Sequence, residues 1–387
     1  MTRVGGMPTF RTGFVQSILS TRPGLQRLTV LLDGEKAPSK AVNYTDLLGA
    51  VAVNDEIVCN TSAVELGLGT GGWHIVHWNL SNREIASVPA GHIMKMRYSS
   101  CQTPVLAASS QESSHHDLLA TVDTVDGMPV AVCGLHSQIA AVAGAFAASA
   151  PGARLAYVMT DAASLPLTLS DLVSQLRAYD LLCTTVSTGQ AFGGEYESVT
   201  VASGLLVARY VCEADAVVVG MGPGVVGTGT KMGFSALEVA ALMETVAGVK
   251  GMPVGVVRAS EADQRVRHRG VSHHTMTAFT FGSPGRRIGE IAVPSGAMGE
   301  LLSEKLLSEG VADRYEIVSS VTGEWRVPLE QAGVVPRSMG RGVDEDPLFW
   351  EAAASAGARL GALVSDAAIS LPPVVFLEQE SSKEAHQ

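Results

Sequence analysis

Two different patterns of apolar and polar positions divide the chain near residue 102. Up to that point, apolar stretches of strand length are separated by turn residues such as Arg22-Pro23-Gly24 and Asp33-Gly34. Short strands at this spacing are typical of a small barrel or sandwich. The expected strands are Phe10–Leu19, Gln26–Leu32, Glu56–Asn60 and His74–Trp78. The pattern therefore predicts a β-rich domain over residues 1–102.

From residue 103 to about residue 325, apolar runs alternate with helical patterns. Leucine or valine at positions 169, 172, 173 and 176 forms one helix face, and Ser235 with Glu238 has the capping-box pattern that opens a second helix. Strands that alternate with helices indicate an α/β fold with a mostly parallel, doubly wound sheet, here preceded by the small N-terminal barrel or sandwich. The expected strands are Pro104–Ala108, Pro129–Cys133, Leu155–Met159, Leu182–Val186, Ala216–Gly220, Pro253–Val257, Ile288–Val293 and Tyr315–Val318.

The end of the chain continues as a helical extension over residues 326–376. Asp346 stands where an N-cap is expected, and Pro347 suits the first position of a helix. The polar run 377–387 is expected to be a disordered tail.

Composition adds two expectations. Hydrophobic residues make up 46% of the chain and charged residues 17%, which fits a sheet covered on both faces, a large subunit interface, or both. We expect a homo-oligomer. No apolar stretch has the length of a membrane span, and residues 1–13 lack the apolar core of a secretory signal. Five cysteines, an odd number without a CxxC pair, favour a reduced, cytoplasmic location.

The charge of the chain restricts its partners. A formal net charge of −11 argues against nucleic acid or an anionic membrane as the main partner. An aromatic content of 5% also weakens any role in base stacking. A small anionic ligand is the partner that we expect.

Polar residues and glycines follow the expected parallel strands. Ligands of open parallel sheets bind beyond the carboxyl ends of the strands, where His136, Asp161 and Arg258 would lie. Strand-to-helix turns need glycines and capping residues in any case, which explains part of this pattern.

The glycine-rich segment Gly222–Lys231 is the strongest single feature. It formally contains G-x-G-x-x-G, the motif of dinucleotide-binding sites. However, Pro223 stiffens the turn, and the next strand is followed by Arg258 instead of the acidic residue that the motif requires. A dinucleotide site is therefore disfavoured. The segment either binds an anion through its amides or is a structural turn. The candidate ligand-binding residues are Gly189, Gln190, Gly193, Gly194, Gly222, Gly224, Gly227, Thr228, Gly229, Thr230 and Arg258.

Histidines are a second candidate source of chemistry, because Ser-His-His occurs at both 114–116 and 272–274. We expect His136, Asp161 and one histidine of each triplet to approach one another, since neighbouring residues of an extended segment point in opposite directions. Such a cluster suits a divalent metal, acid–base work or ordinary hydrogen bonding equally. The candidate catalytic residues are His136, Asp161, His273 and His274, and the candidate metal ligands are His115 and His116. Alternatively, Ser114 caps a helix that contains both of these last histidines.

Four arginines lie close together in an acidic chain, at positions 258, 265, 267 and 269. They could clamp a carboxylate or phosphate. They could equally belong to a solvated helix in which Glu261 pairs with Arg265.

Several segments together resemble an uncharacterised, mainly actinobacterial protein family that is catalogued as a domain of unknown function. The resemblance implies no activity, cofactor or catalytic residue. It rests on Leu66-Gly67-Leu68-Gly69-Thr70-Gly71-Gly72, Gly91-His92-Ile93-Met94-Lys95, Gln111-Glu112-Ser113-Ser114-His115-His116-Asp117, Gly189-Gln190-Ala191-Phe192-Gly193-Gly194, Gly222-Pro223-Gly224, Gly227-Thr228-Gly229-Thr230, Arg269-Gly270-Val271-Ser272-His273-His274 and Arg341-Gly342-Val343-Asp344-Glu345-Asp346-Pro347.

Three functional interpretations follow from the residues. The first is an enzyme that acts on a small anionic metabolite by hydrolysis or group transfer. The second is a non-catalytic ligand sensor or assembly subunit with the same pocket. The third, a nucleotide-dependent oxidoreductase, is disfavoured by the missing acidic residue.

Overall fold

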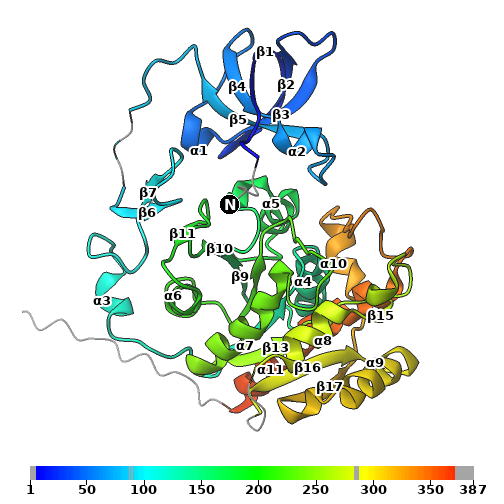
Figure 1. Cartoon of the computed structure of the whole chain (residues 1–387). Coiled ribbons are helices and arrows are strands. Elements are labelled where there is room, and N and C mark those ends of the chain that lie inside the picture. The colour runs from blue at the N-terminus through cyan, green and yellow to red at the C-terminus, as the bar shows by residue number, and fades with distance from the viewer. Residues whose placement is uncertain (1–5, 87, 89, 283–286, 371–387) are drawn as a thin grey trace, which may run out of the picture.

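The computed structural model describes residues 6–86, 88, 90–282 and 287–370 (Figure 1). The tail expected at 377–387 and the end of the extension at 371–376 lie outside these residues. Within the described residues, the helices are too short or too polar to cross a membrane.

The N-terminal part is a closed five-stranded barrel, so the barrel alternative is confirmed. Its strands follow the order β1-β2-β3-β5-β4, and all neighbours pair antiparallel except β3 and β5. This arrangement matches the topology of OB-type barrels. One strand, β3, was not expected, because its first two residues, Ser39 and Lys40, are polar. The elements are β1 (Phe10–Arg22), β2 (Leu25–Leu32), β3 (Ser39–Asn43), α1 (Thr45–Leu48), β4 (Glu56–Asn60), α2 (Ser62–Glu65) and β5 (Trp73–Asn79).

A segment of short elements joins the barrel to the sheet. It contains β6 (Ile93–Lys95), β7 (Thr103–Val105) and the single-turn helix α3 (His116–Leu119). The expected sheet strand Pro104–Ala108 is wrong over its first part, because residues 103–105 pair antiparallel with β6 instead. Only its end reaches the sheet, where Ala107 makes a parallel bridge with Glu197. Proline has no amide hydrogen to donate, so Pro104 suits this two-stranded edge better than the interior of a sheet.

The rest of the chain forms an eight-stranded, fully parallel sheet, as the alternation of strands and helices predicted. Its order is β11-β10-β9-β12-β8-β13-β16-β17. The strands are β8 (Pro129–Cys133), β9 (Leu155–Thr160), β10 (Thr184–Ser187), β11 (Tyr196–Glu197), β12 (Ala216–Met221), β13 (Met252–Gly255), β16 (Gly289–Pro294) and β17 (Tyr315–Ser320), and β14 (Ala259–Ser260) pairs with β15 (Gly270–Val271) outside this sheet.

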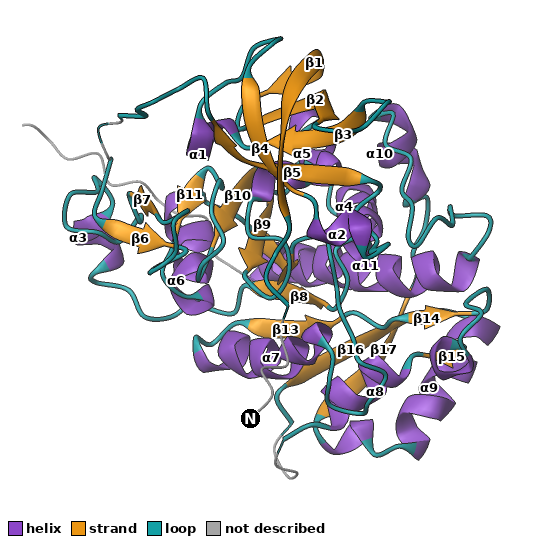
Figure 2. Ribbon diagram, turned by 45° about the horizontal axis from the view of Figure 1, so that its top comes forward, coloured by secondary structure: helices purple, strands orange, loops and turns teal. Residues whose placement is uncertain are grey.

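Helices cover both faces of the sheet, as Figure 2 shows. Successive strand residues point to opposite faces, so Ala131 and Cys133 join one apolar core while Val130 and Val132 join the other. Two covered faces account for much of the high hydrophobic content. One face carries α4 (Gln138–Ser149), α5 (Asp171–Ala178), α10 (Arg326–Gln331) and α11 (Pro347–Ser370); the other carries α6 (Val201–Leu206), α7 (Glu238–Gly248), α8 (His273–Thr280) and α9 (Ala297–Ser308).

Two expected helix caps take other roles. Residues 235–237 form a 3-10 turn before α7, and the carboxylate of Glu238 accepts a hydrogen bond from Thr160 Oγ1, 2.9 Å from each oxygen. The capping box at 235–238 is therefore wrong. Asp346 precedes α11 as expected, but its carboxylate accepts hydrogen bonds from Ser260 Oγ and Arg341 Nε.

The sheet grows in two directions from β8: strands β9, β10 and β11 lie on one side of it, and strands β13, β16 and β17 lie on the other. The chain leaves β8 through α4 on one face, whereas it leaves the neighbouring strand β12 through α7 on the other. Ligands of doubly wound sheets bind at such a switch point, beyond the carboxyl ends of the strands.

Candidate functional site

Three histidine rings pack together near this switch point. His273 and His274 are the first residues of α8, and His268 ends the 3-10 turn Val266–His268. The ring centroids are 4.3 Å apart for His273 and His274, and 4.9 and 4.8 Å from each of these to His268. One nitrogen of each ring lies within 4.8 Å of the others.

Both histidines of the second triplet face this cluster, although only one was expected to do so. Ser272 is the N-cap of α8, and its hydroxyl accepts a hydrogen bond from the His274 amide. The two histidines therefore lie on a helix, where successive side chains are about 100° apart rather than on opposite sides as in a strand.

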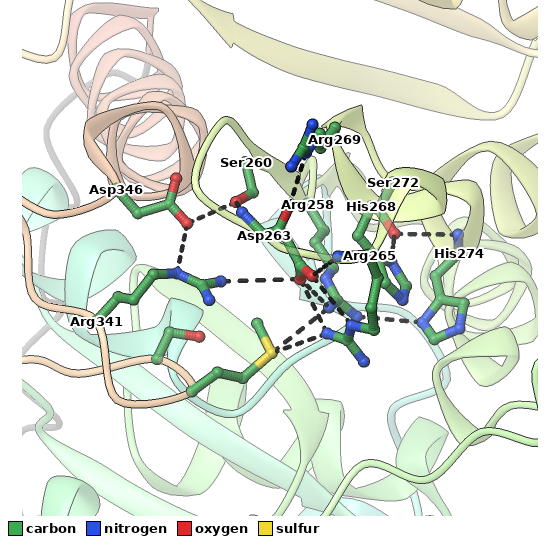
Figure 3. A network of polar contacts seen from close by, with 12 residues as sticks. Arg258, Ser260, Asp263, Arg265, His268, Arg269, Ser272, His274, Arg341 and Asp346 are labelled. Carbon is green, nitrogen blue, oxygen red and sulfur yellow. Dashed lines mark hydrogen bonds and ion pairs between the residues drawn. The ribbon is translucent and has the colours of Figure 1, made fainter.

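Arginines surround the buried carboxylate of Asp263 beside these rings (Figure 3). Asp263 Oδ2 lies 2.9 Å from Arg265 Nη2, 3.7 Å from Arg258 Nη2 and 3.8 Å from Arg341 Nη2. Asp263 is 2% exposed and Arg258 5% exposed. Hydrogen bonds from Arg265 hold the pKa of Asp263 far below its usual range. Positive charge thus exceeds negative charge around this carboxylate.

The alternative of a solvated arginine helix is wrong. Residues 261–265 form turns, and Arg265 binds Asp263 through Nε and Nη2 instead of pairing with Glu261. Burial and the nearby Arg265 lower the pKa of Arg258 to about 10, so its guanidinium keeps its charge at neutral pH.

The three imidazoles are neutral in these surroundings. Burial and the charge of Arg258 lower the pKa of His268 and of His274 to about 3, and burial and Arg267 lower the pKa of His273. The positive end of the α8 dipole acts in the same direction.

Each imidazole has a different hydrogen-bonding environment. Arg258 Nη1 lies 3.2 Å from Nδ1 of His274, and the Ser272 hydroxyl lies 2.7 Å from Nδ1 of His268. Within the described part of the chain, Nε2 of His273 is buried and has no hydrogen-bond partner. A buried nitrogen without a partner costs free energy.

The glycine-rich segment Gly222–Lys231 reaches the same cluster. The Phe234 ring that follows it stacks on His274 at 3.9 Å and 3°. A carbon added to Gly227 would lie 3.7 Å from Nε2 of His274, and one added to Gly229 would lie 3.7 Å from Nη1 of Arg267. Although β8 separates β12 from β13, the segment and Arg258 therefore meet at His274.

Part of this segment is closed by its own hydrogen bonds. The amide and the hydroxyl of Thr228 donate to the Gly233 carbonyl, and the Gly233 amide donates to the Thr230 hydroxyl. The two hydroxyls, which we expected to line an anion site, hold the loop together instead. Gly224 has a φ of +110°, a conformation that favours glycine.

A cavity of about 20 Å³ lies beside the cluster, lined among others by Gly134, Ala236, Arg258 and His274. This volume suits one water-sized group. The residues that line it come from the loops that follow β8, β12 and β13, which identifies the cavity with the switch point.

His136 and Asp161 lie in other surroundings and do not join the three histidines. In His136, Nδ1 lies 3.1 Å from the Met221 carbonyl oxygen, and Nε2 lies 2.7 Å from Ser170 Oγ. Burial lowers the pKa of His136 to about 4. Asp161 Oδ2 accepts a hydrogen bond of 2.8 Å from the amide of Gln190. The expected meeting of these residues with both triplets is therefore wrong.

The first triplet lies beside the strand at one edge of the sheet. The ring of His115 lies 5.8 Å from that of Tyr196 on β11, and Nδ1 of His116 lies 2.9 Å from the Ser109 carbonyl oxygen. Helix α3 begins at His116, so Ser114 is not its N-cap.

The loop that contains Gly189, Gln190, Gly193 and Gly194 is held by a residue that was not singled out. Lys95 is 1% exposed, and its Nζ donates to the Ala191 and Ser198 carbonyls at 2.9 Å and lies 3.2 Å from Glu197 Oε2. The amide of Gly193 donates to Glu197 Oε1. These contacts give the loop a structural role. A lysine within the apolar run Ile93–Lys95 was the available signal.

Sequence reasoning also left three residues near the site out of the candidates: Asp263, His268 and Arg341. His268 stands among arginines in the sequence, which was a usable signal. Arg341 lies more than 70 residues away from the others, so only the packing of α11 against the sheet brings it to Asp263.

Comparisons with known proteins agree with the resemblance drawn from the sequence. No curated protein and no solved structure matches the chain. A family described as "Protein of unknown function (DUF3866)" matches residues 40–357, which include part of the barrel, the whole parallel sheet and the histidine and arginine residues described above. The chain therefore belongs to the DUF3866 family of proteins of unknown function.

Proposed function

We propose that this protein binds a small anionic ligand, bearing a phosphate or carboxylate group, at the carboxyl edge of its parallel sheet. The binding residues are the histidine–arginine cluster, defined as Arg258, Asp263, Arg265, Arg267, His268, His273, His274 and Arg341. The observation that carries the proposal is an excess of guanidinium groups around one carboxylate, next to neutral imidazoles.

Charge and hydrogen bonding support an anion at this position. Arg258, Arg265 and Arg341 share Asp263, and among the residues that the structure describes only Arg341 has a second carboxylate, Asp346, in direct contact. Arg267 is exposed beside the glycine-rich segment. An anion would balance this charge and could accept a hydrogen bond from the unpartnered Nε2 of His273.

Two activities fit such a site. An enzyme would use it for hydrolysis or group transfer on the bound metabolite, with an imidazole as the donor to a developing negative charge. A non-catalytic sensor would only bind the ligand. Turnover of a retained metabolite distinguishes the two.

The test is binding of inorganic phosphate and of small carboxylates, measured by thermal shift and calorimetry. Arg267→Ala should weaken phosphate binding about tenfold or more, since a charge-assisted hydrogen bond contributes about 1.5–3 kcal/mol. Arg287→Ala is the matched control. Arg287 is also exposed, but it stands before β16, at the amino ends of the strands, whereas the site lies at their carboxyl ends. The proposal fails if no anion stabilises the wild-type protein.

A divalent metal is the second candidate, because the three imidazoles bring one nitrogen each within 4.8 Å of one another. The neighbouring guanidinium groups repel a cation, so the anion is favoured. Elemental analysis of the purified protein decides: a stoichiometric metal that is lost in His268→Ala would support the metal instead.

A further inference from the structure

The hydrogen bond between Arg258 and His274 determines which nitrogen of His274 carries a proton. Nη1 of Arg258 lies 3.2 Å from Nδ1 of His274. A guanidinium can only donate, so Nδ1 must be the acceptor and cannot carry a proton. In the neutral ring the proton is then on Nε2.

The neighbouring side chains also hold the ring in one orientation. Phe234 stacks on one face of His274 with an interplanar angle of 3°. The backbone amide of His274 is bound by Ser272 at the start of α8. The edge with Nε2 faces Gly227, where the missing side chain leaves space next to this nitrogen.

We propose that His274 binds an oxygen atom of the anionic ligand as a neutral hydrogen-bond donor through Nε2–H, with Arg258 as the positioning residue that keeps the proton there. The inference rests on the proposed function and deepens it. It assigns His274 the role of a fixed donor to a phosphoryl or carboxyl oxygen, not that of a general base. Nε2 in this state has no lone pair to offer, so it cannot ligate a metal.

Neighbouring groups favour this role over the alternatives. A cationic His274 would stand next to Arg258 and close to Arg267, which like-charge repulsion opposes. A neutral donor in a partly buried site forms a directional hydrogen bond to an oxyanion. His268 has no such fixed state, because its partner, the Ser272 hydroxyl, can either donate or accept.

Phosphate binding by three variants tests the proposal. His274→Ala should lower the affinity for inorganic phosphate about tenfold, whereas His274→Gln, which keeps an N–H donor near the position of Nε2, should stay within about threefold of wild type. Gly227→Leu fills the space beside Nε2 and should abolish binding. His77→Ala, on strand β5 of the barrel, is the control and should bind as the wild type does.

A spectroscopic measurement tests the proton position directly, even if a variant fails to fold. In wild-type protein, ¹⁵N NMR of the histidine rings should show an unprotonated Nδ1 and a protonated Nε2 for His274, and Arg258→Ala should abolish this preference.

The outcomes separate the two proposals. If wild-type protein binds phosphate but His274→Ala binds it equally well, the inference is overturned and the proposed function stands. A protonated Nδ1 overturns the inference by itself. If the wild type binds no anion at all, the proposed function is overturned.

Discussion

At the scale of single residues, the burial of Glu238 changes the pKa of its carboxyl group. Its carboxylate is partly buried at the start of α7 and accepts a hydrogen bond from Thr160. Burial raises its pKa to about 7, although the bond from Thr160 acts in the opposite direction. The folded protein therefore holds this proton more tightly than the unfolded chain does, and the free energy of unfolding falls as pH rises from about 4.5 to about 7.

Glu238→Gln removes this charge and should keep the hydrogen bond from Thr160. We expect the variant to have a higher free energy of unfolding than wild type at pH 8, by about 1–3 kcal/mol, and a smaller advantage at pH 5. Urea denaturation at the two pH values measures both differences. Glu304→Gln, an exposed substitution on α9, is the control. An equal effect of Glu238→Gln at both pH values would contradict the assignment.

Between elements, the packing of α4 against α11 depends on glycine. A side chain on Gly357 of α11 would overlap the Val142 carbonyl of α4, and one on Gly361 would overlap Ser149. Four buried alanines on each helix, at positions 140, 141, 143 and 145 and at positions 353, 354, 356 and 358, also have small side chains, so the two backbones approach closely. The contact also helps to carry the segment with Arg341 to the site.

We expect Gly357→Ala to lower the free energy of unfolding by about 1–3 kcal/mol, because the two helices must separate to admit a methyl group. Gly248→Ala on α7 is the matched control. A side chain there has nothing within 4 Å, so the higher helix propensity of alanine should leave stability unchanged or raise it by up to about 1 kcal/mol. Guanidinium denaturation of both variants measures the contrast. Equal effects at the two positions would refute close helix packing as the cause.

On the scale of the whole molecule, the barrel and the sheet have separate apolar cores. Leu28, Val30 and Ile57 belong to the barrel core, whereas Leu176 belongs to a core of the sheet. A small apolar cluster joins the two parts, in which Leu169 packs against Leu25, Val42 and Tyr44 of the barrel. Ion pairs of Arg22 and of Arg27 with Asp171 also join them. Exposed or partly exposed ion pairs of this kind contribute little to stability.

We therefore expect calorimetry to resolve two unfolding transitions. Leu28→Ala should lower the temperature of one transition and Leu176→Ala that of the other, because each substitution removes about 2–5 kcal/mol from a single core. A single transition that both variants lower equally would show that the barrel and the sheet unfold as one unit.

The sequence by itself determined the architecture. Runs such as Pro129–Cys133 and Ala216–Gly220 predicted parallel strands within one residue, because a strand buried on both faces must be apolar along its whole length. The barrel strand Glu56–Asn60 was predicted without error for a related reason, since turn residues and alternation are local. Arg258, His273 and His274 were also singled out from local pattern, because they follow a strand or precede a helix, and they lie together in the structure.

Only the tertiary structure decided which of these residues meet. Strand order places β12 between β8 and β9, and this separates Asp161 from the second triplet. The His136 ring contacts the Met221 carbonyl and Ser170 instead of the second triplet, and the first triplet lies at the edge beside β11. Asp263 contacts Arg258 and Arg265 from its own segment of the chain, but its contact with Arg341 joins two segments that are far apart in the sequence. Local pattern carries no information on such pairs, because the order of parallel strands and the docking of α11 depend on the packing of whole helices against the sheet.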